Sequence, residues 1–214
     1  NIFGTDYYEA FMSWTERRFG YTFPQEHLVF SHGIVAGLIE LVSYICDDDD
    51  KALIFTPSYG PFKMACDKNN IKTVYSPMIN HNGYYEIDFE DVRQKVKTEN
   101  IKLCIFANPH NPTGRVWSED ELKQLGQIMV DNDVWIISDE IHCDIKRDGQ
   151  THVPFAKAVP DYDKIVTAMS QSKAFNIAGL MFSNLIIPNR RLLKTWKLHH
   201  FSSENPLSIV ATQA

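Results

Sequence analysis

A lysine surrounded by small and apolar residues is the most reactive group that the sequence offers. Lys173 stands in the segment Ser-Lys-Ala-Phe-Asn (172–176), which continues as Ile-Ala-Gly-Leu. When such neighbours desolvate a lysine amine, its pKa falls and the amine can form an imine with an aldehyde. A lysine on a surface loop is the alternative interpretation. Lys173 by itself would more simply be a surface lysine, so it indicates imine chemistry only if other cofactor-binding residues accompany it.

An acidic residue at the end of an apolar run is the second candidate. Asp139 follows Val134–Ser138, so we expect its carboxylate to emerge from a buried strand. A buried acid needs a cationic partner, and a protonated pyridine nitrogen would serve while keeping the ring an electron sink. Asp-Glu after a strand also occurs in magnesium-dependent nucleotide enzymes, but the glycine-rich Walker loop that they require is absent.

An asparagine and a tyrosine could bind the flat part of a cofactor. Asn111 lies in Asn-Pro-His-Asn-Pro-Thr-Gly (108–114), a turn whose prolines restrict the backbone and whose asparagine amides can point into a site. Tyr59 lies between two prolines and could stack on a ring. An ordinary loop and a half-buried packing tyrosine are the alternatives.

The remaining candidate residues could bind a phosphate or exchange a proton. Gly33 precedes Ile34 and Val35 at the predicted start of a helix, where free backbone N–H groups favour a phosphate, and Ser170 could be a second donor. His142 follows Asp139 by three residues and falls within reach of the same pocket, although a lone histidine more often only packs.

Alternating helical and strand-like segments must position these groups. We expect strands over 28–30, 51–55, 72–75, 101–107, 134–138, 165–169 and 183–187, helices over 7–18, 34–46 and 62–68, and two more helices that begin after Asp88 and Ser118 and end near 97 and 131. This alternation is typical of an α/β fold in which helices cover both faces of a mainly parallel sheet. Ligands collect at the carboxyl ends of such strands, where the candidate groups stand.

Composition narrows the class of protein. The formal net charge of -6 would repel a phosphate backbone, so nucleic acid is not expected as a partner. No run approaches the roughly 18 apolar residues of a membrane span, and we expect a cytoplasmic protein. The cysteines are far apart, which favours buried, reduced thiols over a metal site or disulfides; they are Cys46, Cys66, Cys104 and Cys143.

Four motifs in order resemble the pyridoxal 5′-phosphate (PLP)-dependent transferases of fold type I, the class I and II aminotransferase superfamily. They are Pro-Ser-Tyr (57–59), Asn-Pro-Thr-Gly (111–114), Asp-Glu (139–140) and Ser-x-Ser-Lys (170–173). The resemblance implies a three-layer α/β/α large domain with about seven strands over residues 1–214, and a homodimer. It also implies a small C-terminal domain that is absent from this chain, so we expect a fragment of a longer enzyme.

The resemblance also implies a role for each candidate residue. Lys173 would hold PLP as an imine, and Asp139 would pair with the pyridine nitrogen. Asn111 would bond the ring's phenolic oxygen and Tyr59 would stack on the ring. The phosphate would be held by Ile34, Val35 and Ser170.

Longer segments resemble the cystathionine β-lyase branch, the MalY/PatB type of C–S lyase. They are 108–117, 138–144 and 172–180. Many aminotransferases place a phosphate-binding arginine eight residues after the lysine, where this chain has Met181, and that departure favours the lyase branch. The branch usually carries Gly-Tyr-Thr near its start, whereas here Phe3-Gly4 runs into Thr5.

We therefore expect a PLP-dependent lyase that converts L-cystathionine or a related cysteine thioether into pyruvate, ammonia and a thiol. An aminotransferase that uses a 2-keto acid remains the nearest alternative, and a non-catalytic PLP-binding regulatory module is a more distant one. Ser-x-x-Lys (170–173) also matches a serine acyl-transfer motif, but its Lys-Thr-Gly and Ser-Asp-Asn partners are absent.

Overall fold

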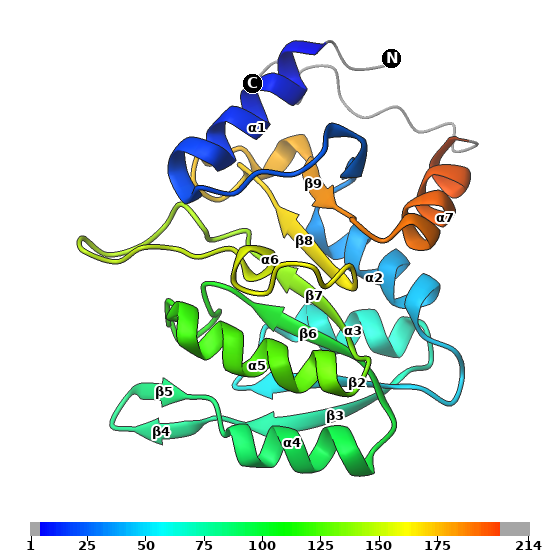
Figure 1. Cartoon of the computed structure of the whole chain (residues 1–214), viewed down its shortest axis with the longest axis vertical. Coiled ribbons are helices and arrows are strands. Elements are labelled where there is room, and N and C mark those ends of the chain that lie inside the picture. The colour runs from blue at the N-terminus through cyan, green and yellow to red at the C-terminus, as the bar shows by residue number, and fades with distance from the viewer. Residues whose placement is uncertain (1–4, 202–214) are drawn as a thin grey trace.

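A seven-stranded sheet runs through the centre of the molecule (Figure 1). The computed structural model describes residues 5–201. The strand order is β1 (Leu28–Ser31), β9 (Ser183–Ile186), β8 (Ile165–Met169), β7 (Trp135–Asp139), β6 (Ile101–Ala107), β2 (Lys51–Thr56) and β3 (Lys72–Pro77). Only β9 runs antiparallel to its neighbours in this sheet. The predicted mainly parallel sheet of about seven strands is confirmed.

Helices cover both faces of this sheet (Figure 1). One layer contains α2 (Ile34–Ile45), α3 (Gly60–Lys68) and α7 (Arg190–Phe201), and the other contains α4 (Phe89–Thr98), α5 (Glu119–Asp131) and α6 (Phe155–Ala158). The helix α1 (Thr5–Phe19) packs over β1 and β9. Side chains alternate along a strand, so Ile54 faces the first layer and Phe55 the second. The fold is the predicted three-layer α/β/α arrangement.

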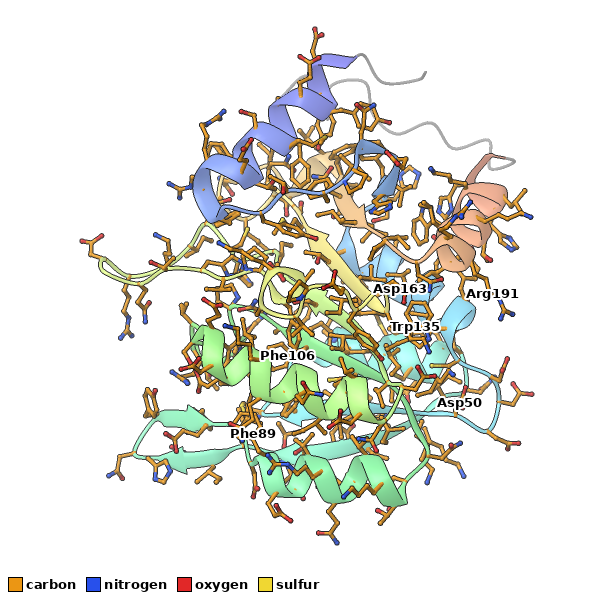
Figure 2. All side chains as sticks on the ribbon, in the orientation of Figure 1. Asp50, Phe89, Phe106, Trp135, Asp163 and Arg191 are labelled. Atoms are coloured by element: carbon orange, nitrogen blue, oxygen red, sulfur yellow. The ribbon has the colours of Figure 1, made fainter. Side chains whose placement is uncertain are left out.

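Aromatic side chains fill much of the space between β6 and the second helix layer. Phe106, labelled in Figure 2, meets Phe55 and Phe155 edge to face at centroid distances of 5.4 and 5.5 Å. Trp117 packs on the same ring and donates its indole N–H to the Ala107 carbonyl at 3.0 Å. Such aromatic pairs add about 0.5–1.5 kcal/mol each beyond burial, so this cluster holds the end of β6 firmly.

Local sequence signals account for several element boundaries. Ser118 and Glu121 form the predicted capping box at the start of α5, and the Asp88 carboxylate caps α4 by accepting the Asp91 N–H at 3.0 Å. The bounds of β6 and β8 equal the predicted ones, because a continuous apolar run is typical of a strand buried on both faces.

The structure contains a small hairpin, two helices and two single 3₁₀ turns that are not among the elements expected above. The hairpin joins β4 (Ile79–His81) to β5 (Tyr84–Glu86) through Asn82 and Gly83, whose φ values are 52° and 94°. Asn-Gly is the usual signal for such a turn, so this element was predictable. The 3₁₀ turns are η1 (Gln25–His27) and η2 (Ala178–Leu180), and the helices are α6, which has only four residues, and α7.

A glycine in α5 allows that helix to approach the segment after α6. A Cβ at Gly126 would lie 2.2 Å from Cγ2 of Val159, and a short β-branched side chain has little room to move away. We expect Gly126→Ala to destabilise the fold by about 1–3 kcal/mol despite its better helix propensity. Urea unfolding measures the change. Gly60→Ala is the matched control because a Cβ there meets nothing within 4 Å, and a Val159→Ala partner substitution should restore stability.

The direction of the strands decides where functional groups gather. Trp135 begins β7, while Asp50 and Asp163 precede β2 and β8, and all three lie on the right-hand side of the view (Figure 2). The carboxyl ends of these strands therefore lie together at the opposite edge. Between residues 5 and 201 no helix is both long enough and apolar enough to cross a membrane.

Candidate active site

Neighbouring strands bring the predicted site residues to one edge of the sheet. Ala107 at the end of β6 pairs with Asp139 of β7, which pairs with Ala168 of β8. Since β9 is antiparallel to both β8 and β1, β1 runs in the same direction as β8. The segments that follow β1, β2, β6, β7 and β8 consequently leave the sheet at the same edge, as the sequence predicts.

Asp139 is a buried carboxyl at the centre of this edge. Its residue is 5% exposed, and its Oδ1 accepts the backbone N–H of Ile141 at 3.1 Å. The pKa of Asp139 is raised to about 7, mainly by burial and also by the nearby Glu140 carboxylate, while the Ile141 N–H and the Lys173 charge act to lower it. A carboxyl in this environment favours either a proton or a cationic partner.

Lys173 lies close enough to Asp139 for its charge to act on that carboxyl, but it is not desolvated. The residue is exposed in the turn that follows β8, along with Ala174 and Phe175. Within the described residues Lys173 thus lies on a surface turn, the alternative that its sequence neighbours leave open. Small neighbours in the sequence do not bury a side chain when the segment lies on the surface, and burial of Lys173 would have to come from additional surface placed over the turn.

Two contacts with α1 hold the turn that carries Lys173. The Tyr7 hydroxyl donates to Asn184 Oδ1 at 2.8 Å and accepts from Gln171 Nε2 at 3.2 Å. Beyond the lysine, the Phe175 ring packs against Trp14 at a centroid distance of 5.9 Å. The turn is thus anchored on both sides of Lys173 although the lysine itself is exposed.

Removing the Tyr7 hydroxyl should loosen this turn. We expect Tyr7→Phe to weaken the anchor by about 1 kcal/mol, the net value of a typical hydrogen bond, and so to speed amide hydrogen exchange over residues 171–176 roughly fivefold. Hydrogen exchange followed by mass spectrometry measures this. Tyr44→Phe on α2 is the control, since its hydroxyl contacts Glu40 on the same helix. Equal exchange in both variants would contradict the proposed anchor.

Asn111 stands in a turn that several contacts stabilise. The Gly114 N–H donates to the His110 carbonyl at 2.8 Å, and the His110 N–H donates to the Arg115 carbonyl at 2.7 Å. Burial, with the charge of Arg115, lowers the pKa of His110 to about 4, so this imidazole is neutral and can share a proton with Thr113 Oγ1 at 2.9 Å. Asn111 itself is half-buried, at the edge where the prediction places it.

Arg115 ties this turn to the β4–β5 hairpin. Its Nε donates to the Tyr85 carbonyl at 2.7 Å, and its guanidinium pairs with the Glu121 carboxylate at the start of α5. The same group lies over the rings of Tyr84 and Trp117 at 4.3 and 4.8 Å from their centroids. The turn that carries Asn111 is therefore fixed between the hairpin and α5.

Tyr59 is half-buried at the residue before α3, and its ring meets Phe62 edge-on at 5.7 Å. It follows β2 at the same edge as Asp139, which suits the predicted stacking role. His142 is also half-buried. Burial and the charge of Lys173 lower the pKa of His142.

The first turn of α2 offers backbone donors, as predicted. Gly33 precedes the helix with φ 86°, a conformation that glycine adopts without strain. The first amides of a helix have no acceptor within it, so the N–H groups of Ile34 and Val35 can receive an anion. A Cβ at Gly33 would lie 3.8 Å from Cε of Met181, so the residue that replaces the usual arginine lies beside this helix start.

Ser170 departs from the predicted phosphate contact. Its hydroxyl donates to the Phe182 carbonyl at 2.7 Å and accepts the Ser172 N–H at 3.2 Å. A serine hydroxyl has one proton to donate, so Ser170 here supports the lysine turn and would have to rotate to reach a phosphate. Sequence reasoning cannot choose between these partners, because both lie after the same strand.

A buried acid–histidine pair was not predicted. The Glu140 carboxylate and the His152 ring are both fully buried, with Oε2 and Nε2 2.7 Å apart. The Asp-Glu motif pointed to Glu140 only by its position, and nothing in the local sequence relates it to a histidine twelve residues later. The described residues contain no cluster of three or more histidine, cysteine, aspartate or glutamate side chains arranged to hold a metal ion.

The chain is similar to known PLP proteins over nearly its whole length. A family model described as aminotransferase class I and II matches residues 5–202. Cystathionine β-lyase PatB of Bacillus subtilis (strain 168) is 38% identical over 183 residues, which cover 85% of this chain and 47% of PatB. The chain spans about half the length of the curated relatives it matches.

Solved structures agree with the sequence relatives. The PLP-bound C–S lyase from Staphylococcus hominis matches with a TM-score of 0.96 and 82% identity, over 100% of this chain and 55% of that one. Cystalysin from Treponema denticola, which contains PLP, matches with a TM-score of 0.94 and 31% identity, over 99% of this chain and 54% of that one. This chain belongs to the class I and II aminotransferase family, the PLP-dependent fold type I superfamily, and its relatives there include cystathionine β-lyases and C–S lyases.

Proposed function

We propose that this chain is the cofactor-binding large domain, residues 1–214, of a longer PLP-dependent C–S β-lyase that acts on L-cystathionine or a related cysteine thioether. The observation that carries the proposal is the buried Asp139 carboxyl at the carboxyl edge of the sheet, with the charge of Lys173 acting on it. The similarity to PatB and to the Staphylococcus hominis C–S lyase supports the choice of reaction.

The residues at this edge fit PLP. Asp139 is buried, makes no ion pair with any residue that the structure describes, and has a pKa near 7, which suits a carboxyl that would pair with a protonated ring nitrogen. The free first-turn amides of α2 and the positive φ of Gly33 suit a phosphate brought close to the backbone. When bound, PLP supplies an electron sink for the charge left on Cα after loss of its proton.

Each residue has a separate task in the proposed reaction. Asp139 would hold a proton at the ring nitrogen of PLP, and Asn111 would donate to its phenolic oxygen. Tyr59 covers one face of the ring, while the first turn of α2 holds the phosphate with Ile34 and Val35.

Lys173 has two tasks, which its exposed position allows it to perform in turn. Its Nζ would hold the cofactor and, as a free amine beside the bound substrate, would take the α-proton as a general base. The Cβ–S bond then breaks and both electrons leave on sulfur, which ends as a thiol. The overall reaction consumes one water and releases pyruvate, ammonia and the thiol.

Aminotransfer is the second candidate function. Aspartate aminotransferase of Bacillus subtilis (strain 168) is 26% identical over 188 residues, so the relatives of this chain include an aminotransferase. That reaction would need a 2-keto acid as acceptor and would leave the Cβ–S bond intact. A PLP-binding module without turnover would consume neither substrate.

Incubating the PLP-loaded full-length protein with L-cystathionine, without any keto acid, tests the proposal. We expect pyruvate, measured by coupling to lactate dehydrogenase, and one thiol per pyruvate. Turnover only after a 2-keto acid is added would favour the aminotransferase instead. No product under either condition from protein that holds PLP would favour the non-catalytic module.

We also propose a homodimer in the cytoplasm. The exposed turn around Lys173 is consistent with a site that further surface must complete, and a partner copy could supply it. The described cysteines are all buried and free, which suits a reducing compartment. Sedimentation of the full-length protein tests the dimer.

A further inference from the structure

Behind Asp139 lies a buried carboxylate with a full set of hydrogen-bond donors. Oε1 of Glu140 accepts the Ser138 hydroxyl and the Phe155 N–H, each at 2.9 Å, and Oε2 faces His152 Nε2 at 2.7 Å. The Phe155 N–H belongs to the first residue of α6, where a helix leaves its amides without internal partners. The Ser138 and Phe155 donors favour the ionised form of this buried carboxylate.

The histidine of this pair is held by one nitrogen only. His152 Nδ1 is buried and has no hydrogen-bond partner among the described residues, while the ring packs edge-on against Phe19 of α1 at 5.1 Å. An imidazolium would place an N–H donor at Nδ1 without an acceptor, which is unfavourable in a buried site. The geometry therefore points to neutral His152 with its proton on Nε2, so the pair keeps the negative charge of Glu140.

This pair acts on Asp139 through the chain. Ser138 and Glu140 flank Asp139, and side chains alternate along a strand, so the bonded pair lies on the face opposite the Asp139 carboxyl. The backbone on both sides of Asp139 is fixed as well, because the Asn108 N–H donates to the Asp139 carbonyl at 2.9 Å and the Glu140 N–H to the Ala168 carbonyl at 2.7 Å.

We propose that Glu140 and His152 form a second, buried layer of the cofactor site, which positions Asp139 and holds a negative charge behind it. Glu140 is thus a positioning residue. The Glu140 charge raises the pKa of Asp139, so without cofactor Asp139 keeps its proton to a higher pH than it would beside a neutral residue. With PLP bound, the same charge would favour the proton shared by Asp139 and the ring nitrogen. The first half of this inference is the effect of Glu140 and His152 on Asp139 without cofactor, and it does not depend on the proposed function. The second half is their effect on the PLP ring nitrogen, and it rests on the proposed function.

The other titratable groups facing this layer stay neutral at ordinary pH. Burial raises the pKa of both Tyr21 and Cys143 far above 9, and the Glu140 charge raises both further. Lys173 is the cation whose charge acts on Asp139. Among the described residues, His152 is the titratable side chain in direct contact with the Glu140 carboxylate.

Titrating Asp139 in the cofactor-free full-length protein tests the first half. Carboxyl ¹³C NMR with labelled aspartate follows the group, and Asp139→Asn assigns its signal. We expect Glu140→Gln to lower the titration midpoint of Asp139 by about one pH unit, because a buried charge nearby is removed. Glu26→Gln, at an exposed residue of η1, is the matched control. An unchanged midpoint in folded Glu140→Gln would overturn the proposal.

Two further measurements keep the test valid if Glu140→Gln does not fold. The ¹⁵N shifts of His152 in the wild-type protein should report a neutral ring protonated on Nε2, and an imidazolium there would overturn the inferred charge. His152→Gln keeps a donor to Glu140 and should leave the Asp139 midpoint unchanged. A higher midpoint in that variant would mean that His152 had been neutralising Glu140.

Loading the variants with ¹⁵N-labelled PLP tests the second half. We expect the ring nitrogen to lose its proton at lower pH in Glu140→Gln than in wild type, and PLP to bind about tenfold more weakly. If the ring nitrogen of PLP lost its proton at the same pH in Glu140→Gln as in wild type, the proposed role of Glu140 toward the cofactor would be overturned. If wild type binds no PLP while the Asp139 titration still responds to Glu140, the proposed function fails and the buried layer stands.

Discussion

Replacing Lys173 with alanine abolishes the visible absorption of the PLP-loaded protein and the covalent attachment of PLP after borohydride reduction. This is the largest effect that we expect from a single substitution, because the proposed covalent bond and the proposed α-proton acceptor are the same Nζ atom. Absorption spectra before and after reduction, followed by peptide mass spectrometry, measure both losses. Pyruvate release from L-cystathionine should fall to background.

Lys146→Ala is the matched control for this prediction. Lys146 is an exposed lysine on the segment after β7, and nothing in the site relies on it. The control variant should keep the absorption band, the trapped adduct on Lys173 and the activity. An adduct on another lysine, or a band that survives Lys173→Ala, would show that the assignment of Lys173 is wrong.

Replacing Asp139 with asparagine should lower the turnover of the loaded enzyme by about 10²–10³-fold. An amide keeps the shape of the carboxylate but removes its charge, and breaking one side of a buried ion pair costs about 3–5 kcal/mol. The loss should fall on kcat more than on KM, since the electron sink matters when Cα loses its proton. Steady-state kinetics with cystathionine measure the two constants.

The same substitution should make the cofactor-free protein more stable at high pH. The pKa of Asp139 is about 7 in the folded chain, against an ordinary value of 3.8, so the folded state binds this proton more tightly than the unfolded state. Below about pH 4 both states hold the proton and Asp139 has no effect. As pH rises from about 4 to 7 the unfolded state ionises first, and stability falls by roughly 4 kcal/mol.

Urea unfolding of wild type and Asp139→Asn at pH 4 and pH 8 measures this difference. The two proteins should have similar stability at pH 4, while the variant should be more stable at pH 8. Asp91→Asn is unsuitable as a control because Asp91 pairs with Lys95, so the exposed Asp148→Asn is preferable. Equal stabilities at pH 8 would mean that the Asp139 carboxyl is not destabilised by burial.

We expect the site to be less stable without its cofactor than with it. Asp139 is buried and forms no ion pair within residues 5–201, and Lys173 stays exposed although its turn is anchored by Tyr7 and Trp14. A bound group with a protonated ring would give the buried Asp139 carboxyl a cationic partner, and its aldehyde could react with the exposed Lys173 amine. Ligands that bind only the folded state raise its stability, so PLP should stabilise this chain most strongly above pH 7.

By itself, the sequence determined the fold class, the family and the strand ends from which chemistry could arise. Continuous apolar runs placed β6 and β8, the Ser118–Glu121 capping box placed α5, and short motifs after the strands placed Asn111, Asp139 and Lys173 at one edge. These are local signals, because periodicity, caps and strand direction depend on residues that are close along the chain.

Only the tertiary structure decided how those groups are held and how exposed they are. The pairing of Glu140 with His152, the anchor of Gln171 on Tyr7 and the bond from Ser170 to the Phe182 carbonyl join residues 12 to 164 positions apart. The exposure of Lys173 likewise depends on which surfaces cover its turn. Burial and hydrogen bonding are properties of the folded surroundings, so a motif can name a reactive side chain without revealing its solvent, its partners or its charge.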